Sequence, residues 1–154
     1  MKILVVQENQ AEADWIANLL NRNPSYRALS LHNRTEALRH ATLLIFDLVL
    51  IGRLPEDSLG LGLGERLRKL MPSCKVVLMV RPWVIEYLKP HRREFEYLVA
   101  PVEPEGLLKK VEYIRNECSL EELAENLRQI YKRSEEQERI RRRERALKQR
   151  SLSP

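Results

Sequence analysis

The sequence predicts an α/β fold: a doubly wound five-stranded parallel sheet with a C-terminal helical extension. Short, wholly apolar runs occur at residues 3–6, 48–51 and 76–80, and such runs are typical of strands buried on both faces. Segments with helical spacing separate these runs, as right-handed βαβ crossovers require. Charged residues dominate towards the C-terminus, so we expect a domain at residues 1–116 and a helical extension at residues 117–154.

Each predicted strand leads into a predicted helix. The strands are expected at residues 3–6, 26–31, 48–51, 75–80 and 95–99. The helices are expected at residues 13–20, from residue 35, at residues 63–70 and 82–89, and from residue 104. Pro72 ends the third helix, because the residue before a proline disfavours helical geometry. Pro104 opens the fifth helix in its first turn, where the missing N–H costs nothing.

A sixth helix is predicted to begin at Ser119, because Ser119-Leu120-Glu121-Glu122 has the form of a capping box. Its apolar residues recur at the a and d spacing of a coiled coil. They are Leu120, Leu123, Leu127 and Ile130. This pattern predicts that the helix pairs with a second copy of the chain and forms a homodimer.

The basic segment, residues 132–150, holds nine Lys/Arg against four Glu, a net charge of +5 that equals the formal net charge of the whole chain. The rest of the chain is therefore neutral. Its candidate nucleic-acid contacts are Arg139, Arg141, Arg142, Arg143 and Arg145. Three interpretations stay open: contact with nucleic-acid phosphates, contact with an acidic membrane surface, or a solvated helix with i,i+4 ion pairs that docks on a partner. We favour the last and do not expect a membrane partner.

Several kinds of site are not expected. The two cysteines, Cys74 and Cys118, lie far apart, and the three histidines are scattered, so no metal, no cofactor and no catalytic triad are predicted. The glycines of residues 60–64 lack the spacing of a phosphate-binding loop, so this segment is interpreted as a loop that enters the third helix. The chain has neither a signal-like apolar region nor a run long enough to span a membrane, which predicts a cytoplasmic protein.

Four stretches resemble the receiver domain of bacterial response regulators, which has a flavodoxin-like fold. Residues 3–6 resemble its first strand, and Asn33-Arg34-Thr35-Glu36-Ala37-Leu38 is similar to the turn into its second helix. Residues 47–51 with Leu54-Pro55 are similar to its third strand and following loop. Tyr97-Leu98-Val99-Ala100-Pro101 resembles the Tyr-x-x-Lys-Pro end of its fifth strand.

The resemblance implies a phosphorylation site whose residues are largely missing. In the family, two acidic residues after the first strand hold Mg²⁺, an aspartate after the third strand accepts phosphate, and a Ser/Thr and a Lys bind the phosphoryl oxygens. The acidic pair falls on Gln7 and Glu8, the acceptor on Gly52, the hydroxyl on Val80 and the lysine on Ala100. The resemblance therefore implies a degenerate pseudo-receiver in which one carboxylate survives.

Asp47 is an alternative acceptor, since residues 43–46 also have the composition of a strand. However, residues 36–38 and 54–55 fit the family's spacing only when Gly52 takes the acceptor position. Asp47 then matches the aspartate that commonly opens the family's third strand. We favour this alignment.

A partner surface is predicted on the face that the family uses for partners and dimers, formed by its fourth helix, fifth strand and fifth helix. Arg81, Trp83, Tyr87 and Tyr97 fall there, and aromatic residues with arginine are typical of interface anchors. The alternative is that Trp83 and Tyr87 only pack the fourth helix.

The sequence thus predicts a non-enzymatic protein-interaction module for signalling that works without phosphorylation. Its expected partners are proteins, including a second copy of itself, and no small-molecule substrate is expected. The alternative is a nucleic-acid-binding regulator that uses the basic segment.

Overall fold

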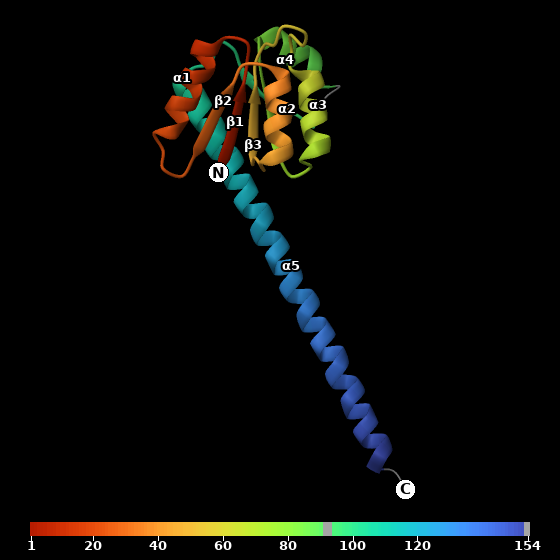
Figure 1. Cartoon of the computed structure of the whole chain (residues 1–154). Coiled ribbons are helices and arrows are strands. Elements are labelled where there is room, and N and C mark those ends of the chain that lie inside the picture. The colour runs from red at the N-terminus through yellow and green to blue at the C-terminus, as the bar shows by residue number, and fades with distance from the viewer. Residues whose placement is uncertain (91–93, 153–154) are drawn as a thin grey trace. The chain divides into compact units, whose positions relative to one another are not determined.

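In the computed structural model, which describes residues 1–90 and 94–152, strands and helices alternate as predicted. His91, one of the three scattered histidines, and the last two residues of the predicted extension lie outside the described residues. The strands are β1 Lys2–Val6, β2 Arg27–Leu31, β3 Leu48–Ile51, β4 Lys75–Val80 and β5 Glu96–Val99. The helices are α1 Gln10–Asn21, α2 Arg34–Leu43, α3 Leu61–Leu70, α4 Pro82–Leu88 and α5 Pro104–Leu152. Figure 1 labels most of these elements.

The five strands form one parallel sheet in the order β2-β1-β3-β4-β5, which confirms the predicted fold class. β1 lies between β2 and β3, with Val6 opposite Leu31 on one side and Ile51 on the other. The strand order reverses direction after β1, so the chain winds to both sides of it. In such sheets the crevice for a ligand lies outside the carboxyl ends of the strands near this point.

Helices cover both faces of the sheet. Buried residues of α2, α3 and α4 pack with one set of strand residues, and α2 and α3 lie side by side in Figure 1. The alternate strand residues point to the other face because successive side chains of a strand alternate. Ile16 and Leu20 of α1 and Leu107 and Val111 of α5 are completely buried, as expected of helices that cover this second face.

The start of α3 differs from the sequence prediction. Gly60 adopts a left-handed φ of 73°, and the helix begins directly after it, so Gly62 and Gly64 belong to α3 and not to a loop. The Asp57 carboxylate accepts a hydrogen bond of 2.9 Å from the Leu63 backbone N–H. Asp57 therefore supplies the cap that the glycine at the helix terminus lacks.

The predicted break before Ser119 is wrong, because α5 is one continuous helix of 49 residues. The Ser119 hydroxyl donates to the Arg115 carbonyl oxygen at 3.0 Å, one turn earlier in the same helix, and so does not cap a new one. Two compact units divide the chain, the body Met1–Glu112 and the tail Tyr113–Pro154, and α5 begins in the body. Among the described residues, no helix combines the length and the apolar composition needed to cross a membrane.

Candidate functional site

A cavity of about 540 Å³ lies at the carboxyl ends of the strands of the body. Each of β1, β3, β4 and β5 ends beside it, and the residues that follow these strands line it. All the predicted phosphorylation-site positions are among its lining residues: Gln7, Glu8, Gly52, Val80 and Ala100. The parallel sheet thus brings these separated positions together at one edge.

The side chain of Gln7 occupies the space beside Gly52. Gln7 is only 6% exposed, and a Cβ built on Gly52 would lie 2.3 Å from its Oε1 and 2.8 Å from its Cβ. The backbone holds the two residues together, since the Gly52 N–H donates to the Val6 carbonyl at 2.8 Å. No side chain therefore fits at position 52 unless Gln7 moves.

The opposite side of the cavity carries small or apolar side chains. Val80 is 5% exposed, and the Ala100 N–H donates to the Val80 carbonyl at 2.8 Å. A valine and an alanine supply neither a hydrogen-bond donor nor a positive charge from their side chains. These two positions therefore offer an oxyanion nothing beyond backbone groups.

The charged residues of the cavity lie at its rim. Glu8, Arg53 and Arg81 are exposed and Glu12 is partly exposed, and all four line the cavity. The Glu8 N–H donates to the Arg53 carbonyl at 2.9 Å. Within residues 1–90 and 94–152, no three His, Cys, Asp or Glu side chains gather in a way that could hold a metal ion.

Asp47, the alternative acceptor, lies at the other end of β3. It precedes the first residue of the strand, whereas Gly52 follows the last. Its carboxylate accepts a hydrogen bond of 2.7 Å from the Lys2 backbone N–H. Residues 43–46, which resembled a strand, instead include the end of α2 and an exposed Ile45. Asp47 is thus separated from the cavity by the length of β3.

Three of the four predicted partner residues line one of two cavities. Arg81 and Trp83 line the cavity at the strand ends, Tyr97 lines a second one of about 650 Å³ with Lys110, and Tyr87 lines neither. Trp83 is 73% and Tyr87 69% exposed. The buried residues of α4 are Val84 and Leu88, so Trp83 and Tyr87 lie on its more exposed side. Their role in binding stays a prediction.

The tail carries exposed apolar and basic residues. The apolar stripe (Leu120, Leu123, Leu127 and Ile130) is exposed along α5. In the basic segment, Arg142 pairs with Glu138 at 2.7 Å and Arg139 with Glu136 at 3.7 Å. Part of the positive charge is therefore balanced within the helix, while Arg141, Arg143 and Arg145 are exposed beside it.

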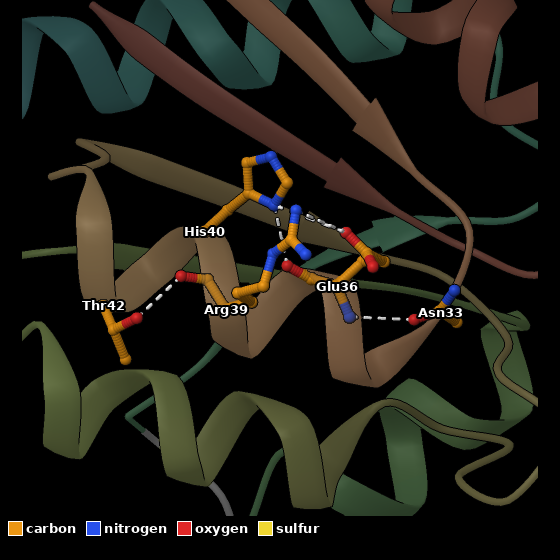
Figure 2. A network of polar contacts seen from close by, with 5 residues as sticks. All are labelled: Asn33, Glu36, Arg39, His40 and Thr42. Atoms are coloured by element: carbon orange, nitrogen blue, oxygen red, sulfur yellow. Dashed lines mark hydrogen bonds and ion pairs between the residues drawn. The ribbon is translucent and has the colours of Figure 1, made fainter.

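A polar network on α2 is a structural feature and not a reaction centre. Figure 2 shows Asn33 Oδ1 accepting from the Glu36 N–H at 2.8 Å, an N-cap, and His40 Nδ1 lying 2.9 Å from the Glu36 carbonyl oxygen. Arg39 and His40 also lie 3.7 and 3.9 Å from Glu36 Oε2. These contacts stay within one helix and its cap, so they explain why Asn33 and Glu36 occur in this motif.

The Gln7 side chain fills the position beside Gly52, which was not predicted from the sequence. The available signal was the pairing itself, a glycine where the family has a side chain and a longer amide where it has a carboxylate. A residue without a Cβ leaves room for a neighbour to approach closely. The rotamer that Gln7 adopts depends on the surrounding packing, which the sequence does not display.

Comparison with known proteins agrees with the fold. The chain is similar to a CheY-like receiver domain from Methylobacillus flagellatus, with 29% identity, a TM-score of 0.63, and coverage of 74% of this chain and 98% of the other. A CheY-like receiver domain from Methanospirillum hungatei JF-1 has 27% identity, a TM-score of 0.66, and coverage of 78% and 97%. The chemotaxis response regulator CheY4 of Vibrio cholerae has 19% identity, a TM-score of 0.64, and coverage of 73% and 97%.

The chain therefore has the flavodoxin-like fold of CheY-like response-regulator receiver domains, extended by a long C-terminal helix. The predicted resemblance is confirmed at this level. No protein-family model and no curated protein matches the sequence.

Proposed function

We propose that this protein is a pseudo-receiver: a non-enzymatic, intracellular signalling module that binds protein partners without being phosphorylated. The observation that carries the proposal is the Gln7 side chain, which lies within 2.3 Å of where a Cβ at Gly52 would be. The space that an acceptor carboxylate would need is therefore filled. The similarity to receiver domains supports the signalling role.

The chemistry of phosphoryl transfer supports the same conclusion. Such transfer depends on positioning and on electrostatic stabilisation of the phosphoryl oxygens. Mg²⁺ is usually anchored by carboxylates, and Glu8 is the one that remains at the expected positions. Val80 and Ala100 add neither donor nor charge. Neither the acceptor position nor the two oxygen-binding positions of this cavity therefore carries a side chain suited to phosphoryl transfer.

Phosphorylation is tested with acetyl phosphate and Mg²⁺, followed by intact-mass measurement. We expect no adduct of about 80 Da, the mass of a phosphoryl group, on the wild-type protein. Asp47→Ala is the matched control, because Asp47 is the alternative acceptor and is held by the Lys2 N–H at 2.7 Å. An adduct on the wild type that disappears in Asp47→Ala would falsify the pseudo-receiver proposal.

The partner surface in this proposal centres on the exposed rings of α4. Trp83 and Tyr87 expose most of their surface beside the exposed Arg81. Large aromatic residues and arginine supply a large share of binding energy at interfaces. The test is quantitative pull-down with Trp83→Ala/Tyr87→Ala and with Trp15→Ala, a partly exposed tryptophan on α1. Partners retained by wild type and Trp15→Ala but lost by the double variant support the surface, whereas equal retention contradicts it.

A second candidate function is nucleic-acid binding through the basic segment. It is favoured by the net charge of +5 on exposed residues 132–150 and opposed by the ion pairs of Arg139 and Arg142. A helix also distributes its arginines around its circumference, so we expect only about three to five phosphates to be contacted. This number gives a log–log salt slope of roughly −3 to −4 and weak, sequence-independent binding.

Fluorescence anisotropy with duplex and single-stranded probes near 150 mM salt separates the two functions. The comparison is between wild type and Arg141→Glu/Arg143→Glu/Arg145→Glu, which reverses three exposed arginines. Weak binding by both proteins supports partner docking. Sub-micromolar binding that the triple variant loses promotes the nucleic-acid function instead.

A further inference from the structure

The apolar stripe of the tail is exposed at all four of its residues. Leu120, Leu123, Leu127 and Ile130 are 66%, 55%, 47% and 60% exposed, although they share one side of α5. Residues at a and d positions of a heptad normally meet those of another helix. This spacing is therefore typical of a helix that pairs with another helix, and the order of the residues along the stripe bears on the direction of that second helix.

The stripe is symmetric about residue 125. Leu123 and Leu127 lie two residues on either side of this point, and Leu120 and Ile130 lie five residues on either side. A helix turned end for end about residue 125 thus presents an apolar residue wherever the original does. Such a stripe fits a second copy of itself in the antiparallel direction, with a two-fold axis between the two helices at the level of residue 125.

The charges around the stripe have opposite signs on the two sides of the same point. Residues 117–124 hold three Glu and no basic residue, whereas residues 126–133 hold two Arg and one Lys and no acidic residue. Glu117 mirrors Arg133, and Glu122 mirrors Arg128. The apolar residues of the stripe are therefore palindromic, and two Glu–Arg pairs mirror each other with reversed sign, whereas Glu121 mirrors Gln129 and Lys132 mirrors Cys118.

This charge pattern distinguishes the two orientations of a dimer. In a parallel, in-register pair each Glu of residues 117–124 lies level with the same Glu of the second copy. Each basic residue of 126–133 likewise lies level with the same basic residue of the second copy. In the antiparallel pair the acidic stretch of one copy lies along the basic stretch of the other. Opposite charges across an interface select partner and orientation, and like charges placed together oppose binding. Arg128 also contacts Glu125 within its own helix at 3.1 Å, which leaves the net charge of each stretch unchanged.

We infer that two copies of this chain pair through α5 as an antiparallel dimer centred on residue 125. Leu120 packs against Ile130 of the second copy, and Leu123 packs against Leu127 of the second copy. Glu117 and Glu122 lie at the levels of the second copy's Arg133 and Arg128. Pairing through α5 does not depend on the Gly52 cavity, so evidence that the body is phosphorylated would not contradict the dimer.

The first experiment measures the oligomeric state of the full chain by light scattering over a concentration series. We expect twice the monomer mass of 18.2 kDa at micromolar concentrations. Leu123→Glu/Leu127→Glu places charges in the two central layers and raises the dissociation constant by at least about 100-fold. Ile140→Glu/Leu147→Glu is the matched control, because both residues are exposed apolar residues of α5 outside the symmetric stripe, and it leaves the constant within about threefold.

The second experiment measures the direction of the helices by disulfide cross-linking in a Cys118→Ser background, with the buried Cys74 retained. Leu120→Cys and Ile130→Cys are oxidised separately and as an equimolar mixture. In the antiparallel dimer, identical cysteines are about 15 Å apart along the axis at 1.5 Å per residue, so neither variant cross-links alone. The mixture does, because position 120 meets position 130.

Each outcome supports or overturns the inference. A dimer that is weakened by the central glutamates and cross-links only in the mixture supports it. Cross-linking of each variant alone shows a parallel dimer and overturns the orientation. A monomer well above about 100 μM, or a dimer insensitive to Leu123→Glu/Leu127→Glu, shows that the stripe meets another protein or none, and overturns the pairing.

Discussion

The close contact between Gln7 and Gly52 predicts that adding a single methyl group at position 52 destabilises the body. The new Cβ of Gly52→Ala would lie 2.3 Å from Gln7 Oε1 and 2.8 Å from Gln7 Cβ. The Oε1 atom is at the flexible end of its side chain and can move away. The Cβ atom of Gln7 is bonded to the backbone directly after β1, so the ends of β1 and β3 must also separate.

The magnitude follows from the cost of overpacking. Inserting a methyl group into a tightly packed site costs about 1–3 kcal/mol. Replacing glycine by alanine also restricts the unfolded chain, which offsets about 0.4–1 kcal/mol of this cost. We therefore expect Gly52→Ala to lower the free energy of unfolding by about 1–2 kcal/mol, or the melting temperature by roughly 2–8 °C.

A double-mutant cycle with Gln7→Ala tests whether this contact is the cause. Truncating Gln7 removes the Oε1 contact at 2.3 Å and the Cδ contact at 3.2 Å but keeps the Cβ contact at 2.8 Å. The cost of Gly52→Ala should therefore fall but not vanish, with a coupling energy of about 0.5–1.5 kcal/mol. Urea unfolding followed by tryptophan fluorescence reports on the body, because Trp15 and Trp83 both belong to it.

Gly106→Ala is the matched control for this cycle. A Cβ on Gly106 meets no atom within 4 Å, so alanine there should be neutral or stabilise α5 by up to about 1 kcal/mol. A Gly52→Ala variant as stable as wild type would show that the space beside Gln7 is not restricted. Strict additivity in the cycle would show that another neighbour causes the loss.

Three further predictions concern helix ends and one carboxylate. Asp57→Ala removes the 2.9 Å hydrogen bond to the Leu63 N–H and should cost about 1 kcal/mol in urea unfolding. Gly60→Ala forces a side chain to a φ of 73° and should cost about 1–3 kcal/mol in the same assay. A hydrogen bond from Gln129 lowers the pKa of Glu125, so Gln129→Ala should raise that pKa in a ¹³C NMR titration. Because the folded pKa is lowered, the contribution of Glu125 to helix stability persists at neutral pH and is lost as the pH falls through that pKa.

Glu56→Ala, at an exposed residue next to Asp57, should leave stability within about 0.5 kcal/mol, and an equal loss would mean that the cap is not responsible. An unchanged Gly60→Ala protein would mean that the turn before α3 adjusts. A Glu125 pKa that is the same with and without Gln129 would assign the shift to Arg128 instead.

Most of the fold was predictable because its signals are local. The runs at residues 3–6, 48–51 and 75–80 are apolar at every or nearly every position, and only a strand covered on both faces tolerates that. The error at Ser119 has a local cause as well. A capping box starts a new helix only where the preceding chain leaves helical geometry, and residues 107–152 contain neither glycine nor proline to break the helix.

The candidate site was predictable in its composition but not in its packing. The positions after β1, β3, β4 and β5 converge because parallel strands end at one edge of the sheet. The resemblance to receiver domains implied this convergence, because it places the site residues directly after these strands. The exposure of Trp83 was left open because a helix as short as α4 has no clear apolar period. The contact of Gln7 with Gly52 arises from a side-chain conformation that only the packed neighbours select.

If the proposed site and the proposed dimer are both correct, binding equilibria and not phosphorylation regulate the interactions of this protein. A receiver that accepts phosphate changes its interactions through a covalent step at the strand ends, and Gln7 leaves no room for that step beside Gly52. The fraction of the protein whose α4 surface or apolar stripe is unoccupied then depends on the concentrations of the protein and of its partners. For a dimer held through the apolar stripe, the midpoint lies at the dissociation constant, so a tenfold change in that constant corresponds to about 1.4 kcal/mol. We expect charge changes at Glu117, Glu122, Arg128 or Arg133 to shift this equilibrium while every residue of the body stays unchanged, because all four belong to the tail.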